Sequence, residues 1–224
     1  MRFVQVTDHS RHDPQDKLRS VRQFYDHIRD RCKVLYQPQQ EVSLDERMVN
    51  CKGHFSFRQF IPSKPIRFGY KLVVLTDSRN GYTMDFNVYL GKANRAPDNM
   101  SASEAVVMTL IKPYLRQGYR LYIDNYYTSL LLLTRLYEQG TRCVGTFRCN
   151  RGPPALQNGK SWAKRVDRGS MRCVRVEGTF VLQWKDKKPV IVASTLHRPT
   201  YSSLCTRNSR DQQGHHGADS GDQA

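Results

Sequence analysis

The sequence predicts an α/β fold in which helices flank a mixed β-sheet. Strand-like segments at 41–49, 71–77 and 82–90 follow one another, and Asn80-Gly81 joins the last two as a hairpin turn. Helical and strand-like segments then alternate from 101 to 147. Antiparallel strands followed by this alternation are typical of a mixed sheet with helices on its faces.

The first element predicted is an amphipathic helix over 16–35. Its apolar residues recur at helical spacing, and the approach to Pro38 ends it. The strand at 41–49 follows. In the hairpin after it, we expect Asn80 and Gly81 both to take the positive φ angles that such a turn uses.

The second half is predicted to place two strands in parallel. Ser101 and Glu104 form a capping-box pattern for a helix that continues toward Gly118, although Pro113 should kink or shorten it. This helix, over 103–116, then serves as the crossover to a strand at 121–124. Ser129 caps a further helix that ends near Gly140, and 143–147 returns as a strand.

The amino-acid composition indicates which class of molecule the protein binds. The 36 Lys and Arg residues outnumber 20 Asp and Glu, giving a net charge of +16, which is typical of proteins that bind nucleic acid. No run approaches the roughly 20 apolar residues of a membrane span, and residues 1–8 lack a signal-peptide core, so we expect a soluble intracellular protein without membrane contact. The six cysteines form no CxxC pair, so we expect reduced thiols and no zinc site.

Several short motifs occur in the order found in piggyBac transposases and the proteins derived from them. The resemblance extends over 16–199 and rests on Ser43-Leu44-Asp45-Glu46-Arg47-Met48, Lys52-Gly53, Pro62-Ser63-Lys64-Pro65, Gly69-Tyr70-Lys71, Tyr89-Leu90-Gly91, Asp124-Asn125-Tyr126-Tyr127-Thr128-Ser129 and Gly145-Thr146-Phe147-Arg148.

This resemblance implies an RNase H-like catalytic fold of the DDE class, which cuts and joins DNA with two divalent ions, Mg²⁺ or Mn²⁺. Carried over by motif, Asp45 matches the first catalytic, metal-binding acid and Asp124 the second. Their oxygens are the hard ligands that Mg²⁺ prefers. Taken singly, Asp45 also fits a solvated strand-end acid and Asp124 a helix N-cap. Glu46 is expected on the opposite face of its strand, without a ligand role.

The predicted organisation has four parts. Residues 1–38 are a residual helical segment, 39–150 a partial RNase H-like core, 151–199 part of a β-rich insertion, and 200–224 a disordered tail. Strands are expected in the insertion at 172–177, 179–184 and 190–195. Asp186 is interpreted as a turn residue between two of them.

The densest basic cluster is predicted to contact DNA phosphates, with a solvated basic loop as the alternative. Trp162 lies within it and is expected either to stack on an unpaired base or to pack. The cluster contains Arg148, Arg151, Lys160, Lys164, Arg165 and Arg168.

The third acid of the resembled family is not found in its motif. Asp211, Asp219 and Asp222 lie in the polar tail outside any such motif. We therefore expect a transposase-derived, nuclear chain that is catalytically incomplete alone, acting as a homodimer or with a full-length transposase. The alternative is a noncatalytic domesticated DNA-binding protein. Cleavage of nicked or hairpin DNA separates the two.

Overall fold

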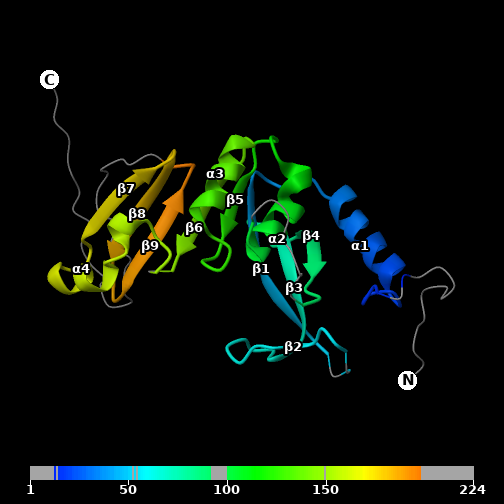
Figure 1. The fold of residues 1–224 in the computed structure, drawn as a ribbon. Coiled ribbons are helices and arrows are strands. Elements are labelled where there is room, and N and C mark those ends of the chain that lie inside the picture. Colours follow the sequence, from blue (N-terminus) through cyan, green and yellow to red (C-terminus); the bar gives the residue numbers. More distant parts are fainter. Residues whose placement is uncertain are drawn as a thin grey trace, which may run out of the picture.

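One mixed β-sheet of nine strands runs through the protein in a computed structural model that describes residues 13, 15–51, 53, 55–91, 100–148 and 150–197. The strand order is β2-β3-β1-β5-β6-β9-β8-β7, with β4 also paired to β3 (Figure 1). The strands are β1 (Glu41–Asn50), β2 (Gln59–Phe60), β3 (Phe68–Asp77), β4 (Thr83–Val88), β5 (Arg120–Ile123), β6 (Arg142–Phe147), β7 (Met171–Val176), β8 (Thr179–Lys185) and β9 (Pro189–Ser194).

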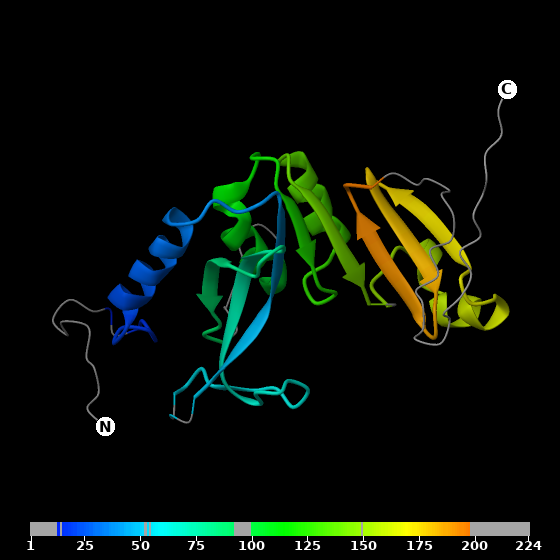
Figure 2. The same cartoon turned by 180° about the vertical axis from the view of Figure 1, so that it is seen from behind.

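The N-terminal helix is shorter than predicted. Helix α1 (Arg22–Val34) begins six residues late, because Asp16 accepts hydrogen bonds from the Leu18 backbone and the Arg22 guanidinium and so holds a turn in front of it. The helix lies beside the edge strand β4 (Figures 1 and 2). Tyr25 packs edge-on against Phe86 with ring centroids 5.4 Å apart, which gives the predicted apolar stripe its contact with the sheet.

The predicted hairpin is present as β3 and β4, but its turn differs. Only Gly81 has a positive φ, of 73°, among the two turn residues. The side-chain oxygen of Asn80 instead accepts a hydrogen bond from the Tyr82 backbone at 2.8 Å. Because that bond closes the turn locally, Asn80 keeps an ordinary φ, and the connection is longer than a two-residue turn.

The crossover helix ends before Pro113, as its missing backbone donor requires. Helix α2 (Ala102–Ile111) starts at the predicted capping box of Ser101 and Glu104, and a 3₁₀ turn at Lys112–Tyr114 follows it. The chain then enters β5, which pairs in parallel with both β1 and β6. Helix α3 (Leu130–Glu138) is capped by Ser129, as predicted.

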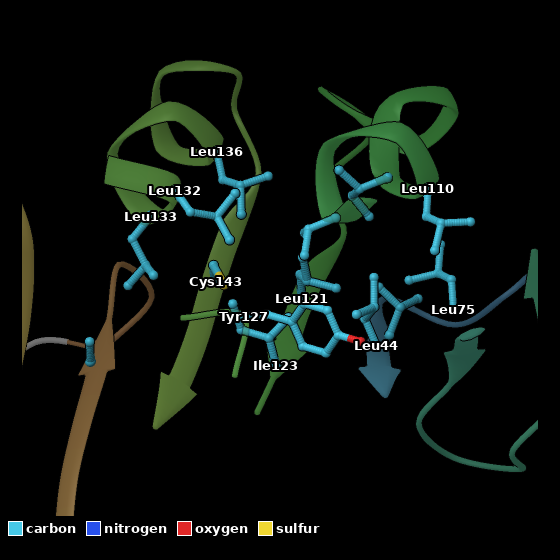
Figure 3. Packing of buried hydrophobic residues seen from close by; sticks show 14 of the residues in the cluster. Leu44, Leu75, Leu110, Leu121, Ile123, Tyr127, Leu132, Leu133, Leu136 and Cys143 are labelled. Atoms are coloured by element: carbon cyan, nitrogen blue, oxygen red, sulfur yellow. The ribbon is translucent and has the colours of Figure 1, made fainter. Parts of the chain in front are cut away.

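Helices α2 and α3 cover one face of the central strands. Leucines from both helices are fully buried against Leu44 and Leu121 of the sheet (Figure 3). Along β1 the even-numbered residues Val42, Leu44 and Met48 are buried, whereas Asp45 and Arg47 are exposed. The opposite face of β1 therefore carries the polar residues, including the first candidate ligand.

The C-terminal strands β7 to β9 form at nearly the predicted positions and continue the same sheet. β9 pairs antiparallel with β6, and β8 and β7 follow (Figure 2). Helix α4 (Gly159–Arg165) and a 3₁₀ turn at Pro154–Leu156 were not predicted. The predicted disordered tail at 200–224 lies outside the described residues.

Within the described residues, the four cysteines are free thiols. In this same part of the chain, no helix is both long enough and apolar enough to cross a membrane.

Candidate metal and DNA site

Asp45 lies in β1, and Asp124 directly follows the end of the neighbouring parallel strand β5. Leu44 of β1 pairs with Ile123 of β5, so Asp45 is the next residue along β1 and Asp124 is the first residue after β5. Matching positions on parallel strands point to the same side of the sheet, and neighbouring strands lie about 4.8 Å apart. Since Leu44 is buried under the helices, Asp45 faces the other side of the sheet, and Asp124 lies exposed directly after the buried Ile123.

Both carboxylates are exposed, and no described cation forms an ion pair with either of them. Two neighbouring carboxylates repel each other unless a cation lies between them. A divalent ion would relieve this repulsion, and carboxylate oxygens suit Mg²⁺ and Mn²⁺. The donor set therefore fits the metal that the sequence resemblance implies.

The turn after Asp124 fixes the position of that residue. Its backbone carbonyl accepts hydrogen bonds from the Tyr127 backbone at 3.1 Å and from Thr128 Oγ1 at 2.9 Å. The cap of α3 is Ser129, whose hydroxyl accepts from the Leu132 backbone at 3.0 Å. The alternative of Asp124 as the N-cap of this helix is therefore wrong, and its carboxylate is not needed there.

A hollow of about 410 Å³ lies beside Asp45 on the open face of the sheet. Arg47 lines it from β1, and the loop between β2 and β3 contributes Lys64, Pro65 and Ile66. Two basic side chains thus lie around a candidate metal ligand, as an anionic phosphate requires. Arg47 and Lys64 were not predicted at this position, because no local sequence signal places them beside Asp45.

Glu46 lies on the helix-covered face, as predicted. Its Oε1 accepts hydrogen bonds from Lys71 Nζ at 2.6 Å and from the Tyr127 hydroxyl at 3.1 Å. Burial and the nearby Glu46 carboxylate raise the pKa of Tyr127 well above its usual value. With both partners in place and on the far side of the strand, Glu46 is not a third ligand to Asp45 and Asp124.

No cluster of three or more His, Cys, Asp or Glu side chains suited to a metal ion occurs in the described parts of the chain. Asp186 lies in the bend between β8 and β9 and pairs with Arg168 at 2.7 Å, consistent with a turn residue. The tail residues Asp211, Asp219 and Asp222 lie outside the described residues.

The structure divides the predicted basic cluster into separate groups. Arg148 follows β6, and its Nε donates to Asn125 Oδ1 at 3.0 Å, beside Asp124; Arg151 lies exposed in the turn after it. A second exposed group belongs to α4. Arg168 instead forms an ion pair with Asp186. This second group contains Lys160, Lys164 and Arg165.

The side chain of Trp162 packs within the β7–β9 part of the protein. The guanidinium of Arg172 lies over its ring at 4.9 Å from the centroid. One face of the indole is thus covered, which favours packing over stacking on a base.

The Transposase IS4 family matches residues 1–218. The chain belongs to this DDE transposase family, of the piggyBac type. It is 29% identical to human PiggyBac transposable element-derived protein 3 over 197 residues and 27% identical to human PiggyBac transposable element-derived protein 2 over 200 residues. Each alignment covers 86% of this chain and 33% of the relative, so the chain spans about a third of their length.

A solved structure supports the same assignment. The piggyBac transposase in a synaptic complex with hairpin DNA matches with a TM-score of 0.74 and 25% identity, over 84% of this chain and 40% of the other. The sheet described above is therefore the RNase H-like sheet of a DDE transposase, and the sequence-based prediction of family and fold is confirmed. The chain carries a DDE transposase-like catalytic domain.

Proposed function

We propose that this chain binds DNA and holds divalent metal ions between Asp45 and Asp124. The parallel pairing of Leu44 with Ile123, which brings the exposed aspartates that follow them to neighbouring positions, is the observation that carries the proposal. The DNA-bound state of the similar piggyBac transposase supports DNA as the partner. A nuclear location follows from the same proposal.

Asp45 and Asp124 would hold Mg²⁺ or Mn²⁺, which when bound activates a water or 3′-hydroxyl and stabilises the leaving oxygen at a phosphodiester. The protein positions the substrate around them. Arg148, oriented by its hydrogen bond to Asn125, presents a cation to DNA phosphates at the carboxyl ends of β5 and β6. Arg47 and Lys64 present two more beside Asp45.

We further propose that the isolated 224-residue polypeptide cleaves DNA weakly or not at all. Two carboxylates leave most of the coordination positions of two ions to water, and a missing protein ligand weakens or misplaces the metal. A full-length transposase would then supply the remaining ligand, whereas a second copy of the chain, as a homodimer, brings the same two acids. The alternative function is DNA binding without metal, as a domesticated noncatalytic protein.

Metal binding tests the proposal directly. We expect calorimetry to detect Mn²⁺ binding to the purified chain, and both Asp45→Asn and Asp124→Asn to weaken it about tenfold or more. Asp30→Asn, on the exposed side of α1, is the matched control and should leave affinity unchanged. Equal affinity in all four proteins would refute the metal site.

A cleavage assay separates the two functions. Nicked and hairpin DNA are incubated with the chain and Mg²⁺ or Mn²⁺, alone and with a full-length transposase in which the two acids matching Asp45 and Asp124 are mutated and the third acid is intact. Cleavage restored only in the mixture, and lost with Asp45→Asn, supports completion in trans. DNA binding that persists while Mn²⁺ never binds supports the noncatalytic alternative.

A further inference from the structure

The hairpin formed by β2 and β3 combines basic and aromatic residues without any acid. From 55 to 70 the sequence contains Arg58, Lys64 and Arg67 and no Asp or Glu. The segment projects beyond the central strands in both views (Figures 1 and 2). It therefore presents a positively charged extension next to the open face of the sheet.

Two exposed phenylalanines form a stacked pair on this hairpin. Phe60 and Phe68 lie opposite each other in the strand register, with ring centroids 4.5 Å apart. Their side chains remain 56% and 47% exposed, although aromatic rings normally become buried. An exposed, flat aromatic pair is typical of a surface that receives a partner.

The pair is held in place by the local structure. The backbone of Ile61 donates to the Arg67 carbonyl at 2.9 Å, which closes the hairpin beyond the Phe60 and Phe68 pair. The guanidinium of Arg58 lies over the Phe68 ring at 4.8 Å from its centroid. The rings are thus fixed before any partner binds, which lowers the entropic cost of stacking.

We propose that the exposed ring of Phe60, backed by Phe68, stacks on an unpaired base of a DNA strand whose backbone passes the hollow at Asp45. Lys64 and Ile66 of this hairpin line that hollow, so one strand can contact both places. This inference rests on the proposed function, because it assigns the path of the DNA that Asp45 would process.

Charge and shape favour a nucleic acid strand over an apolar protein segment. Aromatic rings beside Arg and Lys, with no acid nearby, match the stacked bases and phosphates of single-stranded DNA. A fully paired duplex offers only groove edges and backbone to these rings. The hairpin should therefore distinguish unpaired from paired DNA, as a protein-binding patch would not.

Fluorescence anisotropy with the full 224-residue chain tests this inference. The probes are a labelled single-stranded oligonucleotide and the duplex of the same sequence. We expect Phe60→Leu, which keeps an apolar side chain but removes the ring, to weaken single-strand binding about fivefold or more and to leave duplex binding unchanged. Phe24→Leu, at a 54% exposed aromatic of α1, is the matched control and should change neither.

A second variant shows whether a loss of binding in Phe60→Leu comes from misfolding. Phe60→Trp should retain single-strand affinity, and its added fluorescence should be quenched by the single strand and not by the duplex. Equal loss of both affinities in Phe60→Leu, no loss at all, or no quenching in Phe60→Trp would overturn the inference. If the inference fails but the wild-type chain still binds duplex DNA, the proposed function stands, whereas a wild-type chain that binds no DNA refutes both.

Discussion

The hydroxyl of Tyr127 donates a hydrogen bond to Glu46 Oε1 at 3.1 Å. Glu46 follows Asp45 on β1, and Tyr127 lies in the turn that Asp124 begins, so this contact joins the two segments that carry the candidate ligands. Figure 3 shows the Tyr127 ring lying beneath the helices with its hydroxyl directed toward β1. Because Lys71 shares the same carboxylate oxygen, a small buried polar cluster supports the site from its far side.

Removing parts of this cluster should lower stability by different amounts. Tyr127→Phe loses one hydrogen bond and should reduce the free energy of unfolding by about 1 kcal/mol. Glu46→Ala should cost about 3 kcal/mol, because it leaves the Lys71 ammonium, only 13% exposed, without its anionic partner. Urea denaturation measures both.

Tyr137→Phe is the control for the tyrosine change, since Tyr137 is 41% exposed on α3 and its substitution should cost little. The double variant tests whether the contact is direct. If Tyr127→Phe and Glu46→Ala add without coupling, the two side chains do not act together, and the proposed support of the site would be rejected.

Gly145 of β6 provides the space that the Asp124 turn needs. A Cβ added there would lie 2.9 Å from Ile123 Cγ1 and even closer to the hydroxyl of Thr128, whose side chain binds the Asp124 carbonyl. Gly145→Ala should therefore lower stability by about 1–3 kcal/mol through overpacking, and should also weaken Mn²⁺ binding by shifting Asp124.

Gly152→Ala is the comparison for this glycine, because its Cβ would meet only the flexible end of Ile191, at 3.1 Å. It should cost less stability and leave Mn²⁺ affinity unchanged. Calorimetric titration at a temperature where all variants are folded separates the two effects. A Gly145→Ala protein that binds Mn²⁺ normally would show that the turn does not position the ligand.

Burial of Tyr114 predicts a loss of stability at alkaline pH. Burial raises the pKa of Tyr114 to about 12, from 10.0 in the unfolded chain. Below pH 10 the phenol is protonated in both states and does not affect stability; between pH 10 and 12 only the unfolded state loses the proton, so unfolding becomes easier as the pH rises. Tyr114→Phe removes this dependence.

The wild type should therefore lose about 1.4 kcal/mol of stability per pH unit relative to Tyr114→Phe across this window. The measurement is the difference between the two proteins in denaturation at pH 9, 10, 11 and 12, which cancels the titration of other groups. A difference that stays constant with pH would mean that Tyr114 ionises normally in the folded protein.

Much of the central sheet follows from local sequence signals. Ser101 with Glu104, and Ser129, capped the two helices as predicted, because a cap is a contact between residues a few positions apart. The start of α1 was placed too early, since Asp16 binds Arg22 in a turn, a competition that apolar periodicity does not reveal. The prediction of a positive φ at Asn80 was also wrong because of a local side-chain contact: the Asn80 side chain accepts a hydrogen bond from the Tyr82 backbone and closes the turn.

The parallel placement of β5, which ends just before Asp124, beside the strand that carries Asp45 was predictable, because a helix between two strand-like segments serves as a crossover. The hollow at Asp45 was not, since Lys64 reaches it only through the tertiary position of the β2–β3 loop. The basic residues from Arg148 to Arg168 are close in sequence, but a helix and a turn separate them in space. Closeness in the sequence therefore grouped residues that do not form one cluster on the surface.

Arg148 and Arg151 should contribute more to DNA binding than the basic residues of α4. They follow β6 beside the Asp124 turn, and Arg148 is oriented by Asn125, whereas Lys160 and Lys164 belong to the separate α4 segment. Each lost phosphate contact should lower the slope of log affinity against log salt by about 0.9 for duplex DNA.

We therefore expect the Arg148→Ala, Arg151→Ala double variant to reduce this slope by about 1.8, and the charge-matched Lys160→Ala, Lys164→Ala variant to change it less. Anisotropy titrations at several salt concentrations give both slopes. Equal reductions would place the DNA across the whole basic surface. A larger reduction from the α4 variant would instead indicate that the DNA binds away from Asp124, and would contradict the proposed path.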